Sequence, residues 1–192
     1  MHAQPSYDAT IRDLYRLDRQ QKAEIVGGKL VLMNPTGGVP GYTGGLILAS
    51  LVAYGRRTKS GYAVPDNVGF IVNLPNRRSF SPDVAFYTGP LRKGFLKGAP
   101  VFAVEVRSEH DYGRRAGARM AAKRAAYFAA GTLVVSDVDP LRDECVNVYR
   151  KDNPTTPTMY KRGDVAEAEP ALPDWTLPVD DLLPDRSRSP SE

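Results

Sequence analysis

Two acidic side chains lie at positions where β-strands are predicted and where a carboxylate is unexpected. Asp83 belongs to the stretch Ser-Pro-Asp-Val-Ala-Phe-Tyr at 81–87, and Glu105 lies within the apolar run at 101–107. A carboxylate in an apolar strand is costly unless it is paired or binds a cation. Two hard oxygen ligands suit Mg²⁺, which keeps several waters and prefers one or two carboxylates together with substrate phosphate. The pair therefore indicates a magnesium site that a phosphodiester would complete.

Strand alternation places Glu105 and Arg107 on the same face of their strand. Glu105 could instead form a buried ion pair with Arg107 or another arginine, and spacing alone leaves both interpretations open. Arg107 cannot act as a base, because arginine has no accessible neutral form, yet it can hold a phosphate.

A lysine on the following predicted helix supplies a third group. Ala116, Met120, Lys123 and Tyr127 fall on one helical stripe, so an ammonium lies on a face otherwise suited to packing. Lys123 could simply extend its ammonium to solvent. It could also reach the carboxylate pair, and there orient or deprotonate the attacking water or neutralise developing charge.

The elements that must position these groups are predicted from apolar periodicity and turn residues. We expect helices over 8–17, from residue 46 and over 112–130, a hairpin over 24–33, strands within 62–74, 80–87, 101–107, 133–138, 145–150 and 159–162, and loops at 34–45 and 90–100. Trp175 and Leu182 are expected to pack against the core. This order predicts an α/β layer fold around a mixed sheet.

Composition limits the class of protein. The chain has 192 residues, of which 42% are hydrophobic and 25% charged, and this predicts one globular domain, taken as 1–184, followed by a disordered tail at 185–192. The longest apolar run, 46–53, is too short to cross a bilayer, and the first residues lack signal-peptide features. With Cys145 as the only cysteine, we expect a cytoplasmic protein without thiolate metal clusters or a membrane partner.

The charge is distributed unevenly along the chain. Residues 51–130 contain 14 basic and 5 acidic side chains, whereas the remainder contains 12 and 17. A basic surface attracts a polyanion such as nucleic acid, although solvated faces of ordinary elements would give the same count. Arg114, Arg115 and Arg119 on the predicted helix are the candidate nucleic-acid-binding residues beside Arg107.

Several segments, in this order and spacing, resemble the Uma-two family of restriction-endonuclease-like proteins. They are Ser-Pro-Asp-Val-Ala at 81–85, Pro-Val-Phe-Ala-Val-Glu-Val-Arg-Ser at 100–108, Lys123 with Tyr127 and Gly131, and Leu-Pro-Asp-Trp-Thr-Leu-Pro at 172–178, with further likeness at 11–14, 24–31, 66–70, 138–140 and 146–150. The resemblance spans nearly the whole chain. It implies a PD-(D/E)XK nuclease core with a mixed central β-sheet flanked by helices, DNA as substrate and assembly into a homodimer.

The resemblance also implies roles for particular residues. Asp83 and Glu105 would be the metal-binding acids for Mg²⁺ or Mn²⁺, with the main-chain carbonyl of Val106 as a further ligand. Lys123 would be the nuclease lysine relocated to the helix, since the usual lysine position two residues after Glu105 is Arg107. Glu24 matches the family's acid near the first strand and would position Lys123 or a metal-bound water; as the alternative, it is a surface residue at a strand start.

The leading hypothesis is a metal-dependent endonuclease that hydrolyses DNA by in-line attack of water. Asp83 and Glu105 hold the metal, Lys123 orients the water, and Arg107 holds the backbone. The family usually continues with Pro-Ser after the Glu105 segment, whereas this chain has Glu-His-Asp at 109–111. This departure motivates a second hypothesis, a degenerate nuclease core that binds nucleic acid without cleaving it. A third is a structural domain in which Glu105, Arg107 and Lys123 form a closed ion-pair network.

Overall fold

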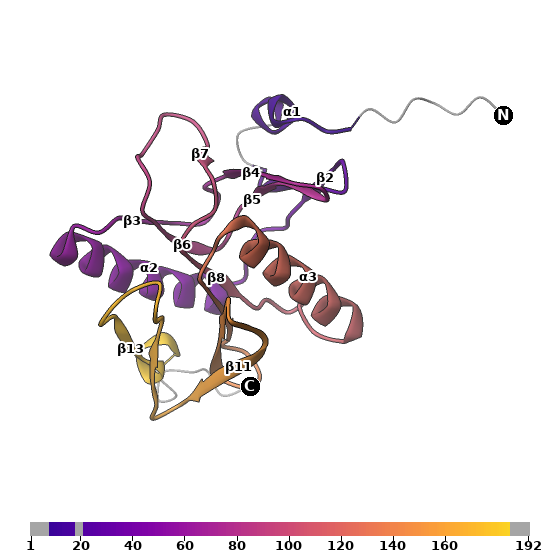
Figure 1. The fold of residues 1–192 in the computed structure, drawn as a ribbon. Coiled ribbons are helices and arrows are strands. Elements are labelled where there is room, and N and C mark those ends of the chain that lie inside the picture. Colours follow the sequence, from indigo (N-terminus) through magenta and orange to yellow (C-terminus); the bar gives the residue numbers. More distant parts are fainter. Residues whose placement is uncertain (1–7, 18–20, 185–192) are drawn as a thin grey trace.

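A six-stranded mixed sheet forms the centre of the molecule, in a computed structural model that describes residues 8–17 and 21–184 (Figure 1). Its strands, in spatial order, are β11 (Asn153–Lys161), β10 (Cys145–Arg150), β9 (Val134–Asp139), β8 (Phe102–Val106), β6 (Val84–Tyr87) and β3 (Tyr62–Val64). β8 and β9 are parallel and are joined by helix α3 (Arg114–Ala130), whereas the other neighbours are antiparallel. Parallel neighbours need such a crossover, and the helix covers one face of the sheet.

A second, five-stranded sheet lies beside the first. Its order is β2 (Lys29–Leu32), β1 (Ala23–Val26), β5 (Arg77–Phe80), β4 (Phe70–Leu74) and β7 (Leu96–Lys97). The predicted hairpin is confirmed, because β1 and β2 pair through a turn in which Gly27 and Gly28 have φ of 55° and 71°. Helix α1 (Ile11–Arg16) also forms as predicted, with Thr10 and Asp13 making a capping box at its start.

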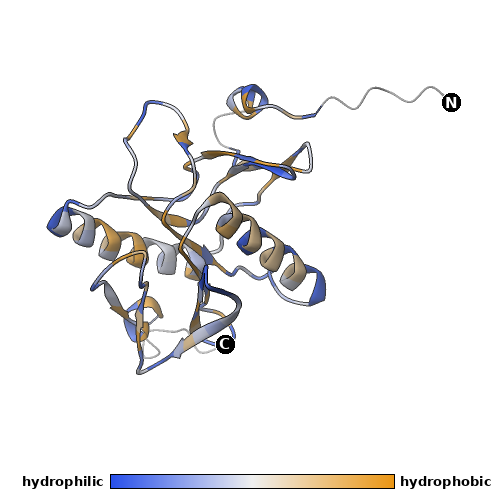
Figure 2. Cartoon of the chain, viewed as in Figure 1, coloured by the Kyte–Doolittle hydropathy of each residue, from blue (hydrophilic) through white to orange (hydrophobic). Residues whose placement is uncertain are grey.

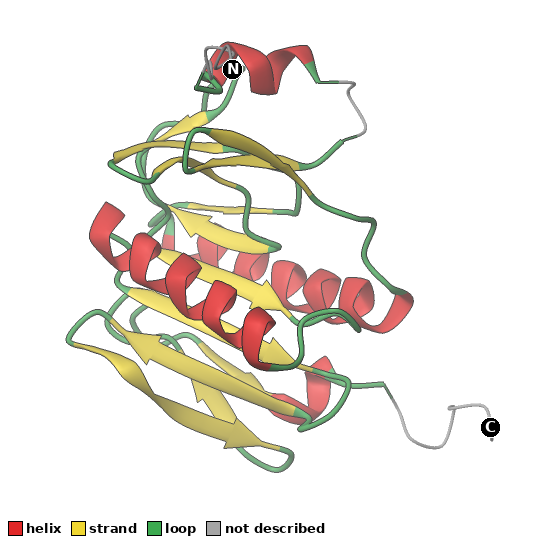
Figure 3. Cartoon of the chain, turned by 90° about the vertical axis from the view of Figure 1, so that its right-hand side faces the viewer, coloured by secondary structure: helices red, strands yellow, loops and turns green. Residues whose placement is uncertain are grey.

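The two long helices lie on opposite faces of the six-stranded sheet (Figure 3). From α2 (Gly38–Thr58), Ile47 and Leu51 pack against the face of β8 that carries Phe102. From α3, Tyr127 packs between the opposite face and residues of the five-stranded sheet. The predicted α/β class, a mixed central sheet flanked by helices, is therefore confirmed.

The C-terminal segment completes the core on the α2 side. It contains the two-stranded sheet of β12 (Val165–Glu167) and β13 (Thr176–Pro178), followed by the 3₁₀ helix η1 (Val179–Leu182). Trp175 and Leu182 are buried there, as predicted. The tail predicted at 185–192 lies outside the described residues. Within the described part of the chain, no helix combines the length and apolar character that a membrane span requires.

The start of α2 differs from the prediction. The glycine-rich stretch up to residue 45 was expected to be a loop, but the helix begins at Gly38. Each glycine inside a helix destabilises it by about 1 kcal/mol relative to alanine, and for this reason the glycine-rich stretch was predicted to be a loop. Tertiary contacts offset it, because Thr43 is fully buried and donates a hydrogen bond of 2.8 Å to the Leu182 carbonyl.

The segment predicted as one strand at 80–87 is also divided. It ends β5 at Phe80 and starts β6 at Val84, and these strands belong to different sheets. Pro82 lies between them and lacks the N–H that a continuous central strand needs. The break leaves Asp83 between the two sheets. Two further strands differ from the prediction. β7 lies inside the predicted loop at 90–100, and β11 starts at Asn153 rather than near residue 159.

Candidate active site

Asp83 and Glu105 meet where β6 and β8 begin to pair. These strands are antiparallel with Val84 opposite Val104, so one further step of the same register sets Asp83 opposite Glu105. The Asp83 carboxylate accepts a hydrogen bond of 2.8 Å from the Val106 N–H, which fixes its orientation. The Asp83 side chain is 22% exposed and that of Glu105 20% exposed. Both carboxylates are thus held by the protein yet reachable from solvent.

Two residues of α3 hold the two oxygens of Glu105. Lys123 Nζ lies 2.7 Å from Glu105 Oε2, and the Tyr127 hydroxyl donates to Oε1 over 2.7 Å. Lys123 and Tyr127 are four residues apart, so they lie on one face of the helix. Tyr127 is fully buried, with its ring stacked on Phe80 at 4.1 Å between centroids. The tyrosine therefore orients Glu105 in addition to packing, a role that sequence reasoning missed although it placed both residues on one stripe.

Glu24 joins this group from the neighbouring sheet. Its carboxylate lies 3.0 Å from Lys123 Nζ, accepts the Ser81 N–H at 2.8 Å and forms an ion pair with Arg77. Glu24 is only 2% exposed, so the interpretation of this residue as a surface acid is wrong. A buried carboxylate with these partners fixes the position of the Lys123 ammonium.

The electrostatics of Glu105 and Lys123 set their protonation. Burial raises the pKa of Glu105 to about 7, helped by the negative charges of Asp83 and Glu24, while Lys123 acts in the opposite direction. Burial alone would lower the pKa of Lys123, but the carboxylates of Glu105 and Glu24 outweigh it and raise that pKa. Lys123 therefore stays an ammonium at neutral pH and serves as a hydrogen-bond donor rather than as a base.

Asp83 has its own lysine, which sequence reasoning missed. Lys22 Nζ lies 2.8 Å from Asp83 Oδ1 and 2.5 Å from Asp66 Oδ1, and its side chain is 13% exposed. Lys22 comes two residues before Glu24, so strand alternation was the signal that could have placed it on the side of the site. Asp66 belongs to the turn between β3 and β4 and offered no such signal.

The donor set fits a divalent cation. The site contains one more negative than positive group; its carboxylates are Glu24, Asp66, Asp83 and Glu105, and its cations are Lys22, Arg77 and Lys123. Within residues 8–17 and 21–184, no three His, Cys, Asp or Glu side chains are grouped to hold an ion by themselves. An ion at Asp83 and Glu105 would therefore need water, main-chain or phosphate oxygens, as Mg²⁺ prefers.

A cavity of about 210 Å³ opens beside Asp83. One wall is the glycine-rich first half of α2, where Gly41, Gly44 and Gly45 have no side chains to fill the space. The other wall includes Asp83 and Val106. This volume is below the range of drug-sized ligand pockets. It provides room for a small part of a polymer chain next to the carboxylates.

The structure places Arg107 away from the Glu105 carboxylate. Its guanidinium donates two hydrogen bonds, of 2.7 and 2.8 Å, to the carboxylate of Asp137 on β9, and Asp139 lies 3.9 Å away. Glu105 and Arg107 thus do not pair with each other, and the closed network of Glu105, Arg107 and Lys123 does not form as hypothesised. A bidentate pair of this kind holds β8 and β9 together where both strands end.

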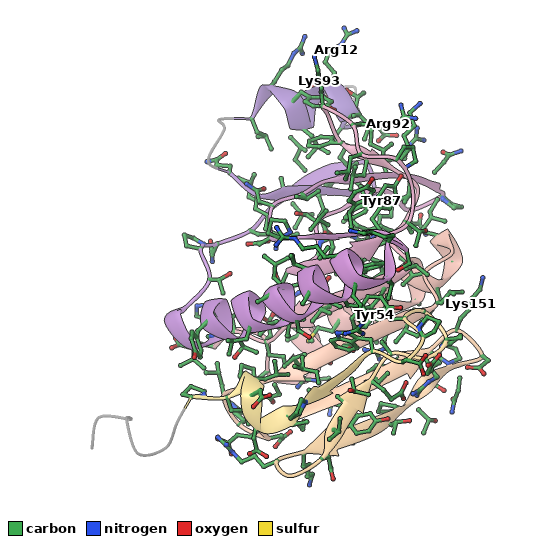
Figure 4. All side chains as sticks on the ribbon, turned by 90° about the vertical axis from the view of Figure 1, so that its left-hand side faces the viewer. Arg12, Tyr54, Tyr87, Arg92, Lys93 and Lys151 are labelled. Carbon is green, nitrogen blue, oxygen red and sulfur yellow. The ribbon has the colours of Figure 1, made fainter. Side chains whose placement is uncertain are left out.

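The remaining candidate arginines lie at the start of α3. Arg114 and Arg115 are exposed in its first turn, where Figure 2 shows a hydrophilic helix end, and Arg119 pairs with Asp111 at 3.0 Å. Further basic side chains extend from another part of the surface, where α1 contacts the loop before β7 through Tyr15 stacked on Phe95; Figure 4 labels three of them, Arg12, Arg92 and Lys93. The basic middle of the sequence is therefore divided between at least two surfaces.

Comparisons with known proteins connect this geometry to a family. A family model for Uma2, described as "Putative restriction endonuclease", matches residues 10–180. A crystal structure from Anabaena variabilis, described as "a putative nuclease belonging to DUF820", superposes with a TM-score of 0.73 at 16% sequence identity and covers 91% of this chain and 97% of that one. At this identity the likeness establishes a shared fold. A search of curated proteins found no match.

Proposed function

The chain belongs to the Uma2 family of restriction-endonuclease-like proteins, and from this premise we propose that it is a divalent-metal-dependent endonuclease that hydrolyses DNA phosphodiester bonds. The observation that carries the proposal is the meeting of Asp83 and Glu105, with the Lys123 ammonium 2.7 Å from Glu105. Two acids and a lysine, with one of the acids, Asp83, lining a cavity, form a site that can bind a cation and a phosphate together.

Asp83, Glu105 and the main-chain carbonyl of Val106 would hold Mg²⁺ or Mn²⁺, and the bound ion would supply Lewis-acid stabilisation of a phosphoryl oxygen. The Val106 N–H and the Tyr127 hydroxyl fix the two carboxylates before substrate arrives. Such preorganisation lowers the reorganisation needed at the moment of reaction.

We assign to Lys123 the stabilisation of the negative charge that develops on the phosphate during hydrolysis. As an ammonium it donates hydrogen bonds, either to the attacking water or to a non-bridging phosphate oxygen. Glu24, which also pairs with Arg77, contacts the ammonium from the side of the second sheet, so Lys123 Nζ stays next to Glu105. The cavity beside Asp83 would accommodate part of the nucleotide adjoining the scissile phosphate.

The test is cleavage of supercoiled plasmid and of single-stranded DNA with Mg²⁺ or Mn²⁺. We expect Asp83→Asn and Glu105→Gln to abolish nicking, and Asp152→Asn, a change of the same type in the exposed turn between β10 and β11, to retain it. Equal nicking by all four proteins would indicate a contaminant and overturn the proposal. Salt-sensitive DNA binding with no cleavage by the wild type would favour the degenerate, binding-only core. The homodimer and the cytoplasmic setting remain predictions, and sedimentation equilibrium would measure the first.

A further inference from the structure

Each of the two candidate metal-binding acids has its own lysine, and only one of these lysines belongs to the proposed catalytic group. Lys123 lies between Glu105 and Glu24, and Lys22 lies between Asp83 and Asp66. The two sets share no side chain, although Asp83 and Glu105 are neighbours. Lys22 therefore needs an explanation of its own.

Lys22 covers an oxygen that a divalent ion would use. Asp83 Oδ2 accepts the Val106 N–H, and Asp83 Oδ1 is the oxygen that contacts the Lys22 ammonium at 2.8 Å. The ammonium is mostly buried and lies at hydrogen-bond distance from two carboxylates. A divalent ion binds in the same kind of position, in contact with carboxylate oxygens. An ion at Asp83 and the Lys22 ammonium would also repel each other strongly at such short range.

We propose that Lys22 is a built-in counter-cation that competes with the divalent ion for Asp83 and, once displaced, binds the phosphate of the DNA substrate. The inference rests on the proposed function, since it assigns a role at the same site. Without metal, the positive charge of Lys22 lies between Asp83 and Asp66 and reduces the repulsion between these two nearby carboxylates. With metal, Asp83 is neutralised by the ion and the ammonium becomes free to move.

The surroundings of Lys22 favour a phosphate as its second partner. Asp66 and Asp83, which hold the ammonium, both line the cavity beside α2, so Lys22 lies at the margin of the space assigned to the substrate. Asp66 is half exposed and can keep a flexible lysine near this margin after Asp83 is lost as a partner. Lysine binds phosphate as a point charge and needs no fixed fork geometry, so a short movement is sufficient.

Isothermal titration calorimetry with Mn²⁺, without DNA, tests the competition directly. We expect Lys22→Met to bind Mn²⁺ at least about tenfold more tightly than the wild type, because the competing charge is gone. Lys22→Arg keeps the charge and should remain close to the wild type. Lys29→Met removes one exposed lysine from the adjacent hairpin strand and controls for the change in net charge. Circular dichroism and thermal unfolding confirm that each variant is folded.

A DNA-binding measurement with Ca²⁺ in place of Mn²⁺ tests whether the displaced Lys22 binds the phosphate of DNA. Lys22→Met should bind a DNA duplex several-fold more weakly although it binds metal more tightly, and this opposite change distinguishes a phosphate contact from a purely structural lysine. Unchanged or weaker Mn²⁺ affinity in Lys22→Met, or no Mn²⁺ binding by the wild type and both Lys22 variants, overturns the proposal. Competition for Mn²⁺ without any DNA cleavage would instead refute the proposed nuclease function and leave the competition established.

Discussion

The Lys123 ammonium lies 3.0 Å from Glu24 Oε1, and this contact joins helix α3 to the five-stranded sheet. The same ammonium contacts Glu105 in the six-stranded sheet at 2.7 Å. One cation therefore lies between two carboxylates that come from different sheets and that would otherwise repel each other, and one of them, Glu24, also pairs with Arg77. The candidate catalytic lysine is for this reason also a structural residue, and its substitution should change stability as well as activity.

Lys123→Met should lower the free energy of unfolding by about 3–5 kcal/mol, because it removes the cation that Glu105 and the buried Glu24 share, and only Glu24 keeps another cation, Arg77. Urea denaturation followed by circular dichroism measures this loss. Lys151→Met, at an exposed turn labelled in Figure 4, should change stability by less than about 0.5 kcal/mol. A Lys123→Met protein as stable as the wild type would show that Glu24 and Glu105 do not need this cation.

Tyr127→Phe should separate the packing of this residue from its hydrogen bond. The ring stacked on Phe80 is retained, so we expect a loss of only about 2 kcal/mol for the hydrogen bond to Glu105. Removal of a group that orients a metal ligand typically costs about 10–100-fold in metal affinity or activity. Calorimetry with Mn²⁺ measures the affinity. Tyr54→Phe removes a hydroxyl that donates to the Pro173 carbonyl and should leave Mn²⁺ affinity unchanged.

Sequence reasoning identified the acids and the lysine of this site because each contradicts its local pattern. Asp83 and Glu105 are charges next to or within apolar strands, and Lys123 is a charge on a packing stripe. The same reasoning missed Lys22 and Asp66, since neither interrupts an apolar element and their meeting depends on the approach of two sheets. It also misplaced the start of α2, where burial of Thr43 outweighs the low helix propensity of several glycines.

Spacing placed Arg107 on the same strand face as Glu105, and the structure adds a partner on β9, Asp137, that spacing could not reveal. Arg107→Met should leave the buried Asp137 carboxylate unpaired and destabilise the fold by about 3–5 kcal/mol. Lysine would rescue it poorly, because it cannot make the bidentate contact. Unfolding measurements on the double variant Arg107→Met with Asp137→Leu should show much of the stability restored. If that folded double variant also bound DNA normally, the predicted backbone contact of Arg107 would be wrong.

The pKa of Glu105 gives the stability a defined pH dependence. The carboxyl has a pKa of about 7 in the folded protein against an ordinary value of 4.5, so the folded state keeps this proton longer than the unfolded state. The favourable contribution of protonated Glu105 to the free energy of unfolding is fully present below about pH 4.5. It is lost as the pH rises through about 7, and the free energy of unfolding then decreases by up to about 3 kcal/mol. We expect the stability of the wild type to fall relative to Glu105→Gln between pH 5 and 7.5. Glu109→Gln, an exposed glutamate nearby, should follow the wild type at every pH.

Arg114 and Arg115 occupy the first turn of α3, where no acidic residue is present. A positive charge is unfavourable at a helix N-terminus by about 0.3–1 kcal/mol, so these arginines oppose the helix dipole and gain from an anion placed there. Replacement of both arginines by alanine should therefore have two effects in the same variant: the free energy of unfolding should rise slightly, and DNA binding should become weaker.

Fluorescence anisotropy with a labelled duplex, at several salt concentrations, measures the binding change. If each arginine contacts one phosphate, the slope of log affinity against log salt should decrease by about 2 in magnitude. Arg56→Ala with Arg57→Ala removes the same charge from the last turn of α2, where basic residues favour the helix, and should lower stability slightly. An unchanged salt slope in the α3 variant, with the α2 variant binding less DNA, would place the DNA-binding surface on the other helix.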